Sequence, residues 1–455
     1  MISIPVIVLL TWIPISLFVF YRYPFRKALL IVMIGGWGIL PNANYKLSSD
    51  PFPYWFMGLD IASGYLLTKA TVVSFCSLSG LLLFDRNTIR RFSVTLWDIP
   101  MIVWCLVPIF SGTANSLSFA EIFHGEIYQL LAWGLPYLLG RIYFSTSDSL
   151  RLAAQAIVIA GLLYVPFCLF EIWRGPILYQ HCYGYLPLQW VGAKRYIGYR
   201  PIGFLENGNQ LGIWMATAAL IAIWLWAKQI VKKVLGIPAA WAALLLFVVT
   251  LLCQSGGSIL LLLGLLPFAF LSYKSYPRFL AVFLIAGIVG FAGLRLANVF
   301  SLRALVHHNA AAHATASFLK RIGRGSLGWR LSQDEANVGV ALRKPLLGYG
   351  EWDWWRLGHP RPWGLWLLAF GMYGAFGFIA LEMLQLAPVI RVVWFSLARS
   401  DIEYLNLRHA LAGAILMTAI DNLLNGSMIL PLLLVIGGMS TWSSAGKRVR
   451  VDIGC

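Results

Sequence analysis

The chain is short of charge, and acidic side chains are the scarcer kind. Only 12% of its 455 residues are charged, with 18 acidic against 35 basic side chains, while 59% are hydrophobic. So little charge excludes an ordinary soluble globular protein. A net charge of +17 would indicate nucleic-acid binding in a soluble protein, but in a membrane protein it reflects topology and contact with anionic lipid. We therefore expect membrane lipid, and no nucleic acid, among the partners.

The chain also lacks the residue patterns of a metal or disulfide site. Its six cysteines show no CxxC spacing and most lie in apolar runs, which argues against zinc and against a disulfide framework. His307, His308 and His313 have no acidic or cysteine partner at ligand spacing. We expect no metal and no cofactor. No internal repeat is visible, which argues against inverted-repeat transporter folds.

Long apolar runs are what the chain has in abundance, and each can cross about 30 Å of hydrocarbon as a helix. A bilayer denies water to backbone amides, so helices are the expected spanning form. These runs predict an all-α polytopic integral membrane protein with about 12–14 transmembrane helices and one large periplasmic loop containing short helices. The candidate spans are residues 3–20, 27–41, 59–84, 98–115, 121–143, 152–172, 208–227, 238–254, 258–273, 279–299, 363–389, 409–424 and 428–443.

The connections between these spans alternate in charge. Seven basic connections are each separated from the next by two spans, so they share one face, and the positive-inside rule makes it cytoplasmic. They are residues 22–27, 85–91, 141–151, 228–233, 274–278, 391–408 and 446–450. The predicted organisation is residues 1–299 as transmembrane helices with a smaller basic periplasmic loop at 174–207, 300–362 as a large periplasmic loop, 363–445 as C-terminal transmembrane helices and 446–455 as a cytoplasmic tail.

Two of the periplasmic loops carry positive charge on the face where it is normally scarce. Loop 174–207 contains four basic residues, and loop 300–362 contains nine against four acidic ones. A negatively charged, lipid-linked substrate would explain an excess shared by two loops. The alternative is that loops of about sixty residues translocate regardless of charge, or that one miscounted span places the second loop in the cytoplasm.

Residues 194–214, KRYIGYRPIGFLENGNQLGIW, lead from the first of these loops into a predicted helix. Arg195 and Arg200 can present planar guanidinium groups to phosphate oxygens, while the helix N-terminus offers unpaired amides and a positive dipole end. Glu206, Asn207 and Asn209 lie where they would cap that helix. The alternative is a helix cap flanked by interfacial arginines.

The second loop ends in a glycine turn followed by tryptophans. Gly348 and Gly350 allow a tight turn. Trp352, Trp354 and Trp355 offer flat apolar faces on which sugar C–H groups can pack, or they form an interfacial aromatic belt.

His359 is the candidate proton acceptor. It lies between Arg356 and Arg361, close to the next membrane helix. Histidine can accept a proton from a sugar hydroxyl near neutral pH. The alternative is an ordinary polar loop residue.

Residues 328–342 predict an amphipathic helix on which Arg330 could simply pair with the acidic residues 334 and 335. Ionisable residues inside spans are functional candidates by default, and here they include Lys69 and Asp421. Asp421 lies at the outer end of its span with Asn422 and Asn425. These three either line the floor of a shared cavity or join helices by hydrogen bonds.

With these motifs the chain resembles the O-antigen ligase and O-antigen polymerase superfamily of bacterial envelope glycosyltransferases. RPIGFLENGNQLG (200–212) is similar to the family's arginine–glycine segment leading into a helix. RKPLLGYGEW (343–352) is similar to its proline and glycine-x-glycine turn, and GHPRPWGLWLLAFGMYG (358–374) to its histidine-initiated helix ending in paired glycines, here Gly371 and Gly374. Ser255 matches a serine-arginine-glycine turn in which glycine here replaces arginine, and His359 is followed by proline where the family has asparagine. PYLLGRIYF (136–144) resembles exopolysaccharide-locus relatives.

The resemblance implies a metal-independent, inverting glycosyl transfer at the periplasmic face of a bacterial inner membrane. The implied donor is a saccharide on polyprenyl pyrophosphate, and the acceptor is a hydroxyl of a glycan or lipid core in O-antigen or exopolysaccharide assembly. The implied catalytic residues are His359 as the base, with Arg200 and Arg330 neutralising the departing diphosphate. The implied substrate-binding residues are Arg195, Arg324, Arg361, Trp352, Trp354, Trp355, Asn209 and Asp421.

Two hypotheses stay open beside this one. Ligase and polymerase differ only in the acceptor, and the exopolysaccharide-like features favour the polymerase slightly. The alternative from another class is a transporter or flippase of lipid-linked oligosaccharides. Such a protein should carry paired ionisable residues deep in several spans and should have little need of a large external loop. Few deep charges and a large loop favour the enzyme.

Overall fold

A computed structural model describes residues 3–42, 67–186, 194–270, 276–297, 301, 306, 308–321, 326–356, 361–395, 402–426 and 428–440. The described residues are mostly helical, with 77% helix and 2% strand. Within these ranges, five helices are long and apolar enough to cross a membrane, namely Ile4–Arg22, Leu96–Ala114, Ser147–Arg174, Gly208–Ala227 and Leu365–Trp394. They confirm the helical fold class and indicate a membrane protein. The predicted tail 446–455 lies outside the described residues.

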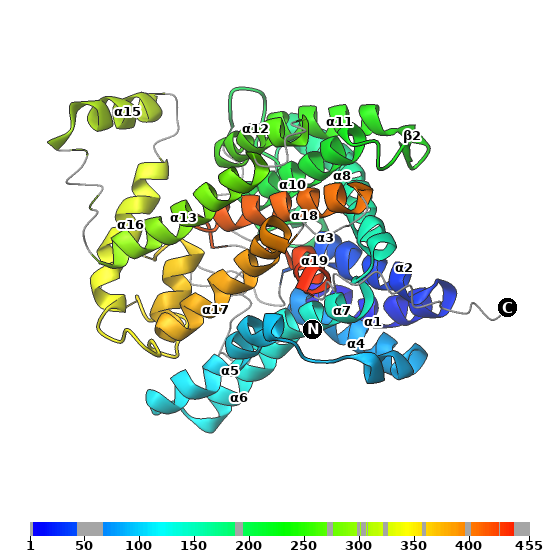
Figure 1. The fold of residues 1–455 in the computed structure, drawn as a ribbon, viewed down its shortest axis with the longest axis horizontal. Helices are drawn as coiled ribbons and strands as arrows, with labels where there is room; N and C mark the ends of the chain where they lie inside the picture. The colour runs from blue at the N-terminus through cyan, green and yellow to red at the C-terminus, as the bar shows by residue number, and fades with distance from the viewer. Residues whose placement is uncertain are drawn as a thin grey trace.

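The helices occupy the positions of the predicted spans (Figure 1). The first part of the chain forms α1 (Ile4–Arg22), α2 (Phe25–Leu30), the π-helical turn η1 (Ile31–Gly35), α3 (Gly36–Ile39), α4 (Lys69–Phe84), η4 (Arg86–Arg91), η5 (Leu96–Asp98), α5 (Ile99–Ala114), α6 (Phe119–Gln129), the π-helical turn η6 (Leu130–Gly134), α7 (Leu135–Tyr143), α8 (Ser147–Arg174) and α9 (Leu178–Tyr183). The second part forms α10 (Gly208–Ala227), the hairpin strands β1 (Lys233–Val234) and β2 (Ile237–Pro238), α11 (Ala239–Leu252), α12 (Gly256–Phe270), α13 (Tyr276–Leu296), α15 (Ala310–Arg321), α16 (Ser326–Ala341), α17 (Leu365–Phe395), α18 (Ile402–Asp421) and α19 (Leu430–Ser440).

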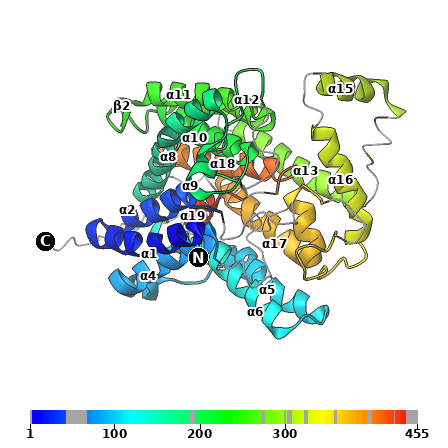
Figure 2. The ribbon, with the colours of Figure 1, turned by 180° about the vertical axis from the view of Figure 1, so that it is seen from behind.

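Helix α10 lies at the centre of the bundle, as both ribbon views show (Figures 1 and 2). It packs against α8, α11, α12 and α18. Its sequence is apolar all round, which is the pattern of a helix buried on every side. The segment that precedes α10 therefore passes from the surface at residues 194–197 to the interior at residues 201–206.

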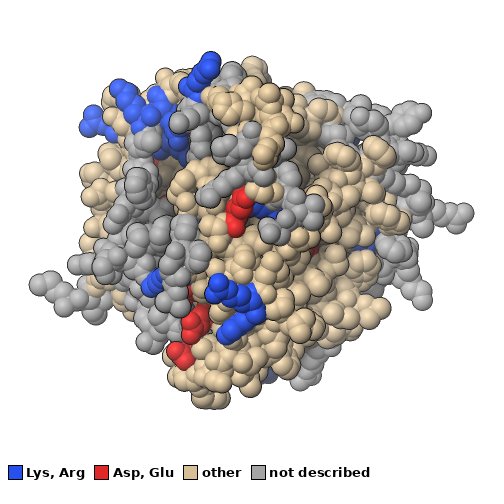
Figure 3. Space-filling view, turned by 90° about the vertical axis from the view of Figure 1, so that its left-hand side faces the viewer, with Lys and Arg blue, Asp and Glu red and all other residues tan. Residues whose placement is uncertain are grey.

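The helices of residues 300–362 lie at one end of the molecule. Helix α16 packs against α13 and α17, whereas α15 stands away from the bundle in both views (Figures 1 and 2). Exposed basic side chains gather in separate groups on the face that these helices form, with fewer acidic ones (Figure 3). The predicted short helices in this part of the chain are thus present, and α16 covers the predicted range 328–342 up to Ala341.

The predicted span 363–389 is not one continuous helix, because α17 is broken at Gly374, where φ is 64° and ψ is −159°. Residues 345–350 run alongside the break and form hydrogen bonds with it. The amides of Tyr349 and Gly350 donate to the carbonyl oxygens of Gly371 (3.0 Å) and Met372 (2.8 Å). Beyond the break, the Ala375 amide donates to the Pro345 carbonyl oxygen at 2.8 Å. The loop segment supplies partners that a regular helix would supply itself.

Two pairs of glycines make this close approach possible. Gly348 and Gly350 have φ of 66° and 79°, which confirms the predicted tight turn. A Cβ atom on Gly371 would lie 2.0 Å from Cε2 of Trp354, and one on Gly374 would lie 2.2 Å from the carbonyl carbon of Leu346. The glycine pairs that the family resemblance singled out therefore both lie where residues 345–350 approach the break in α17.

We expect Gly374→Ala to destabilise the protein by at least about 2 kcal/mol, because the new Cβ strains the backbone and collides with residue 346. Thermal unfolding of the purified protein in detergent measures the change. Gly236→Ala is the matched control, since Gly236 also has a positive φ (80°) but nothing lies near its Cβ position. Equal effects of the two substitutions would show that the contact at the break contributes nothing.

Candidate functional site

The basic segment before α10 is fixed at both ends. The Tyr199 amide donates to the Ile172 carbonyl oxygen of α8 at 2.9 Å. At the other end, the Asn207 side chain accepts hydrogen bonds from the amides of Asn209 (2.8 Å) and Gln210 (3.0 Å), which confirms its predicted role as helix cap. Arg200 is therefore held between the end of one membrane helix and the start of another.

The Arg200 guanidinium lies against the first turn of α10. Its Nη2 donates to Oδ1 of Asn209 at 2.6 Å and to Oγ of Ser255 at 3.1 Å. A Cβ atom on Gly208 would lie 2.4 Å from Nε of Arg200, so only glycine leaves room for the side chain there. The arginine and the helix N-terminus thus present positive charge at the same place.

Arg330 reaches the same region from α16. Its Nη1 donates to Oδ1 of Asn425 at 2.6 Å, and Nδ2 of Asn425 donates to Oδ1 of Asp421 at 2.8 Å. The guanidinium also lies 5.7 Å from the ring centre of Trp363. An amide thus stands between the arginine and the carboxylate and orients both.

Asp421 connects the two arginines. Its buried carboxylate interacts electrostatically with Arg330 and with Arg200. A Cβ atom on Gly257 would lie 4.0 Å from Oδ1 of Asp421, which places the carboxylate at the start of α12, beside Ser255. The structure therefore brings together Arg200, Asn209, Arg330 and Asp421, which the sequence had assigned to one site.

The two alternatives for the end of α18 apply to different residues. Asn422 joins helices, because its Nδ2 donates to Oε1 of Gln385 at 2.8 Å and its carbonyl oxygen accepts from the Leu365 amide at 2.8 Å. The Asn425 carbonyl oxygen also accepts from the Leu365 amide, at 3.3 Å, but the Asn425 side chain binds Arg330 and links it to Asp421. Of the three, only Asp421 and Asn425 belong to the candidate site.

Asp334 docks α16 onto the start of α17. Its Oδ1 accepts hydrogen bonds from the amides of Trp363 (2.6 Å) and Gly364 (3.3 Å). Burial raises the pKa of Asp334 from 3.8 to about 6, against the opposing effect of these amides and of the Arg295 and Arg361 charges. Arg330 bonds to Asn425 rather than forming the simple helical pair that the sequence left open.

Arg361 lies between two acidic groups. It is buried, and its guanidinium lies 4.8 Å from the ring centre of Trp363. Burial lowers the pKa of Arg361, and the charges of Glu206 and Asp334 counteract that shift. Burial likewise raises the pKa of Glu206, which Arg361 and Lys69 oppose. Positive and negative charges thus alternate in the order Lys69, Glu206, Arg361 and Asp334, from α4 to α16.

The remaining predicted residues are placed as follows. Trp352, Trp354 and Trp355 are only 3–5% exposed, so they pack inside the protein rather than forming an interfacial belt. Arg195 is half-buried in the turn before Arg200, and no contact links it to Asp421. His359 and Arg324 lie outside the described residues.

Glu206 and Asp334 have larger roles than the sequence indicates. The sequence predicts Glu206 as a helix cap and leaves Asp334 as a possible partner of Arg330 at helical spacing, whereas both are buried beside Arg361. The signal that could have identified them is scarcity: the chain has only 18 acidic residues, and these two fall in its unusually basic loops.

Among the described residues, no group of three or more His, Cys, Asp and Glu side chains could hold a metal ion. Comparison of the chain with protein-family models and with curated proteins found no match.

The raised pKa of Asp334 predicts a pH-dependent stability. The folded protein binds this proton more tightly than the unfolded chain, so the contribution of Asp334 is full below about pH 4 and is lost as the pH rises through about 6. We expect Asp334→Asn, whose amide oxygen can still accept both backbone bonds, to lose less thermal stability than the wild type between about pH 4 and about pH 7. Asp148→Asn, at an exposed carboxylate, is the control. Identical pH profiles for Asp334→Asn and the wild type would contradict the assignment.

Proposed function

We propose that the chain is a membrane glycosyltransferase of the O-antigen ligase and polymerase type. It transfers a saccharide from polyprenyl pyrophosphate to an acceptor hydroxyl, as polymerase or ligase, at the periplasmic face of a bacterial inner membrane. The observation that carries this proposal is the convergence of two arginines from separate basic loops near Asp421. Arg200 bonds to Ser255 at the start of α12, where the Cβ position of Gly257 lies 4.0 Å from Oδ1 of Asp421, and Arg330 reaches Asp421 through Asn425. Two guanidinium groups beside a helix N-terminus suit a diphosphate at the membrane edge.

In this reaction the acceptor oxygen attacks the anomeric carbon from the side opposite the diphosphate. The new carbon–oxygen bond forms as the bond to the diphosphate breaks, and the diphosphate leaves with the electron pair. Arg200 and Arg330 stabilise the negative charge that develops on it. Asn209, Ser255 and Asn425 are neutral hydrogen-bond partners that orient the guanidinium groups. His359 accepts the proton from the acceptor hydroxyl in this proposal.

The proposed membrane arrangement follows from the same contacts. Arg200 of loop 174–207 and Arg330 of loop 300–362 both lie near the Asp421 carboxylate at the end of α18. A shared site requires a shared side of the membrane, which supports a polytopic arrangement with both loops in the periplasm. The basic connections on the other face then lie in the cytoplasm, as the positive-inside rule requires.

We expect Arg200→Ala and Arg330→Ala to weaken binding of undecaprenyl pyrophosphate by about tenfold or more, because each removes charge-assisted hydrogen bonds to the diphosphate. Both should also abolish surface polysaccharide in the native host. Titration of the purified protein in nanodiscs measures the first effect, and gel analysis of cell-surface glycans measures the second.

Arg174→Ala and Arg321→Ala are the matched controls, because these arginines are exposed and lie in the same two loops. Wild-type affinity and polysaccharide in the Arg200 and Arg330 variants would overturn the diphosphate role. Transfer of a labelled polyprenyl-pyrophosphate-linked saccharide across the membrane of vesicles that contain the protein, with no new glycosidic bond, would instead identify a flippase.

Cys182 offers a native test of the topology. It is exposed and lies in loop 174–207, whereas Cys76, Cys105, Cys168 and Cys253 are buried. We expect a membrane-impermeant maleimide to label intact spheroplasts at Cys182 and Cys182→Ser to lose that label. Labelling of Cys182 only after lysis would place the loop in the cytoplasm and rule out the proposed arrangement.

A further inference from the structure

Two tryptophans lie beside Arg330 where α16 meets the start of α17. Trp329 precedes the arginine on α16, and its ring centre lies 5.4 Å from that of Trp363. The ring centre of Trp363 lies 5.7 Å from the guanidinium carbon of Arg330. Trp363 is therefore in contact range of both Trp329 and the arginine, and it joins the aromatic residue on α16 to the charged one.

Trp329 is the exposed member of this pair. It is 51% exposed, whereas the three tryptophans that the sequence assigned to sugar packing are almost completely buried. A buried ring offers a sugar no free face, so Trp329 suits that role better than Trp352, Trp354 or Trp355. Large apolar side chains with a free face beside a polar site are typical of ligand contacts.

The packing of α16 on α17 holds this pair in place. Asp334, on the same helix as Trp329, accepts hydrogen bonds from the amides of Trp363 (2.6 Å) and Gly364 (3.3 Å). The guanidinium of Arg361 lies 4.8 Å from the ring centre of Trp363 as well. Trp363 is thus fixed through its backbone and its ring, and Trp329 packs on it. A surface ordered before the ligand arrives loses little conformational entropy on binding.

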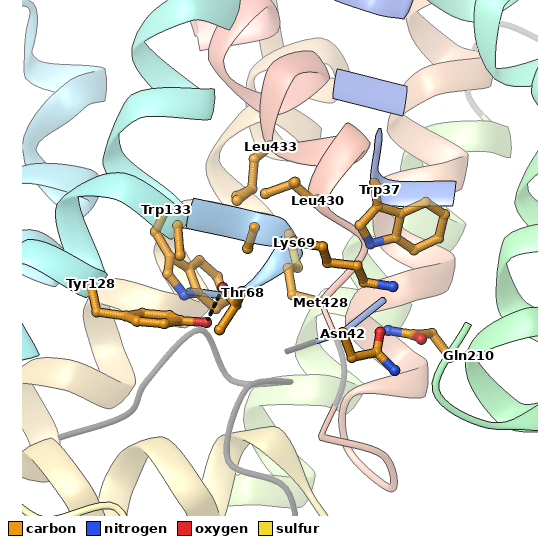
Figure 4. Close-up of a pocket in the computed structure, with 12 residues that line it drawn as sticks. Trp37, Asn42, Thr68, Lys69, Tyr128, Trp133, Gln210, Met428, Leu430 and Leu433 are labelled. Atoms are coloured by element: carbon orange, nitrogen blue, oxygen red, sulfur yellow. Dashed lines mark hydrogen bonds between the residues drawn. The ribbon is translucent and has the colours of Figure 1, made fainter. Parts of the chain in front are cut away.

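The small polar pocket beside α10 is not an alternative place for a sugar. Lys69, Trp37 and Trp133 are among the residues that line it (Figure 4). Its volume is only about 40 Å³, which is room for a few water molecules but not for a pyranose ring. A sugar therefore needs a more open surface, and Trp329 provides one next to Arg330.

We propose that the first sugar of the lipid-linked donor packs on the ring of Trp329, which Trp363 supports from behind. This inference rests on the proposed function and adds the position of the sugar to that of the diphosphate. The first sugar is bonded directly to the diphosphate, so a diphosphate on Arg330 brings that sugar within reach of Trp329. The face of an indole ring carries partial negative charge, and the polarised C–H groups of a pyranose pack on it without requiring a charged sugar.

The test compares the affinity of purified full-length protein in nanodiscs for three lipids. They are undecaprenyl pyrophosphate and the same lipid carrying one D-glucose or one D-galactose residue. We expect the wild type to bind at least one sugar-bearing lipid about fivefold more tightly than the bare lipid, because one ring contact contributes about that much. Trp329→Ala should remove this preference and bind the bare lipid like the wild type, whereas Trp329→Phe should keep part of the preference. Both variants should fold, because the side chain is exposed.

Trp241→Ala is the matched control and should bind all three lipids like the wild type. Trp241 is also exposed, but it lies with Trp226 at the opposite end of α10 from the arginine site. Three results would each overturn the inference: equal affinity of the wild type for all three lipids, an unchanged sugar preference in Trp329→Ala, or an equal loss of affinity for bare and sugar-bearing lipids in that variant. Arg330→Ala tests the proposed function separately. If it binds the bare lipid like the wild type, the diphosphate role fails while a sugar preference that depends on Trp329 stands.

Discussion

A buried carboxylate needs cations beside it, and the arrangement of this site depends on how Asp421 meets that need. Its charge partners, Arg200 and Arg330, come from segments that precede α10 and α17. The groups that surround the Asp421 carboxylate therefore come from four places. These are the starts of α10 and α12, the end of α18 and the helix α16. Neutral amides and a hydroxyl orient the two arginines within this arrangement.

The sequence predicts most helix positions and part of the arginine site. The features that it does not predict depend on contacts between distant parts of the chain. Apolar length gave the helix positions, and the residues before α10 indicated both the Asn207 cap and Arg200. The break at Gly374 could not be predicted, because it depends on backbone partners from residues 345–350. The burial of Trp352, Trp354 and Trp355 could not be predicted either. A tryptophan beside a membrane helix has the same sequence pattern whether lipid or protein covers it.

Four buried charges from different elements influence one another. Glu206 lies within the electrostatic reach of Lys69 and of Arg361, and Arg361 in turn acts on Asp334 beside α16. Each of these charges therefore partly offsets the cost of burying the next one.

The broken α17 also has a consequence for biosynthesis. Around Gly374 the helix depends on residues 345–350 for hydrogen bonds, and unpaired backbone groups are costly in hydrocarbon. Those residues are translated before α17, so its missing partners leave the ribosome ahead of it. Residues 345–350 are thus available to pair with α17 as soon as that helix is made. A chain without them would insert α17 with unpaired backbone groups around Gly374.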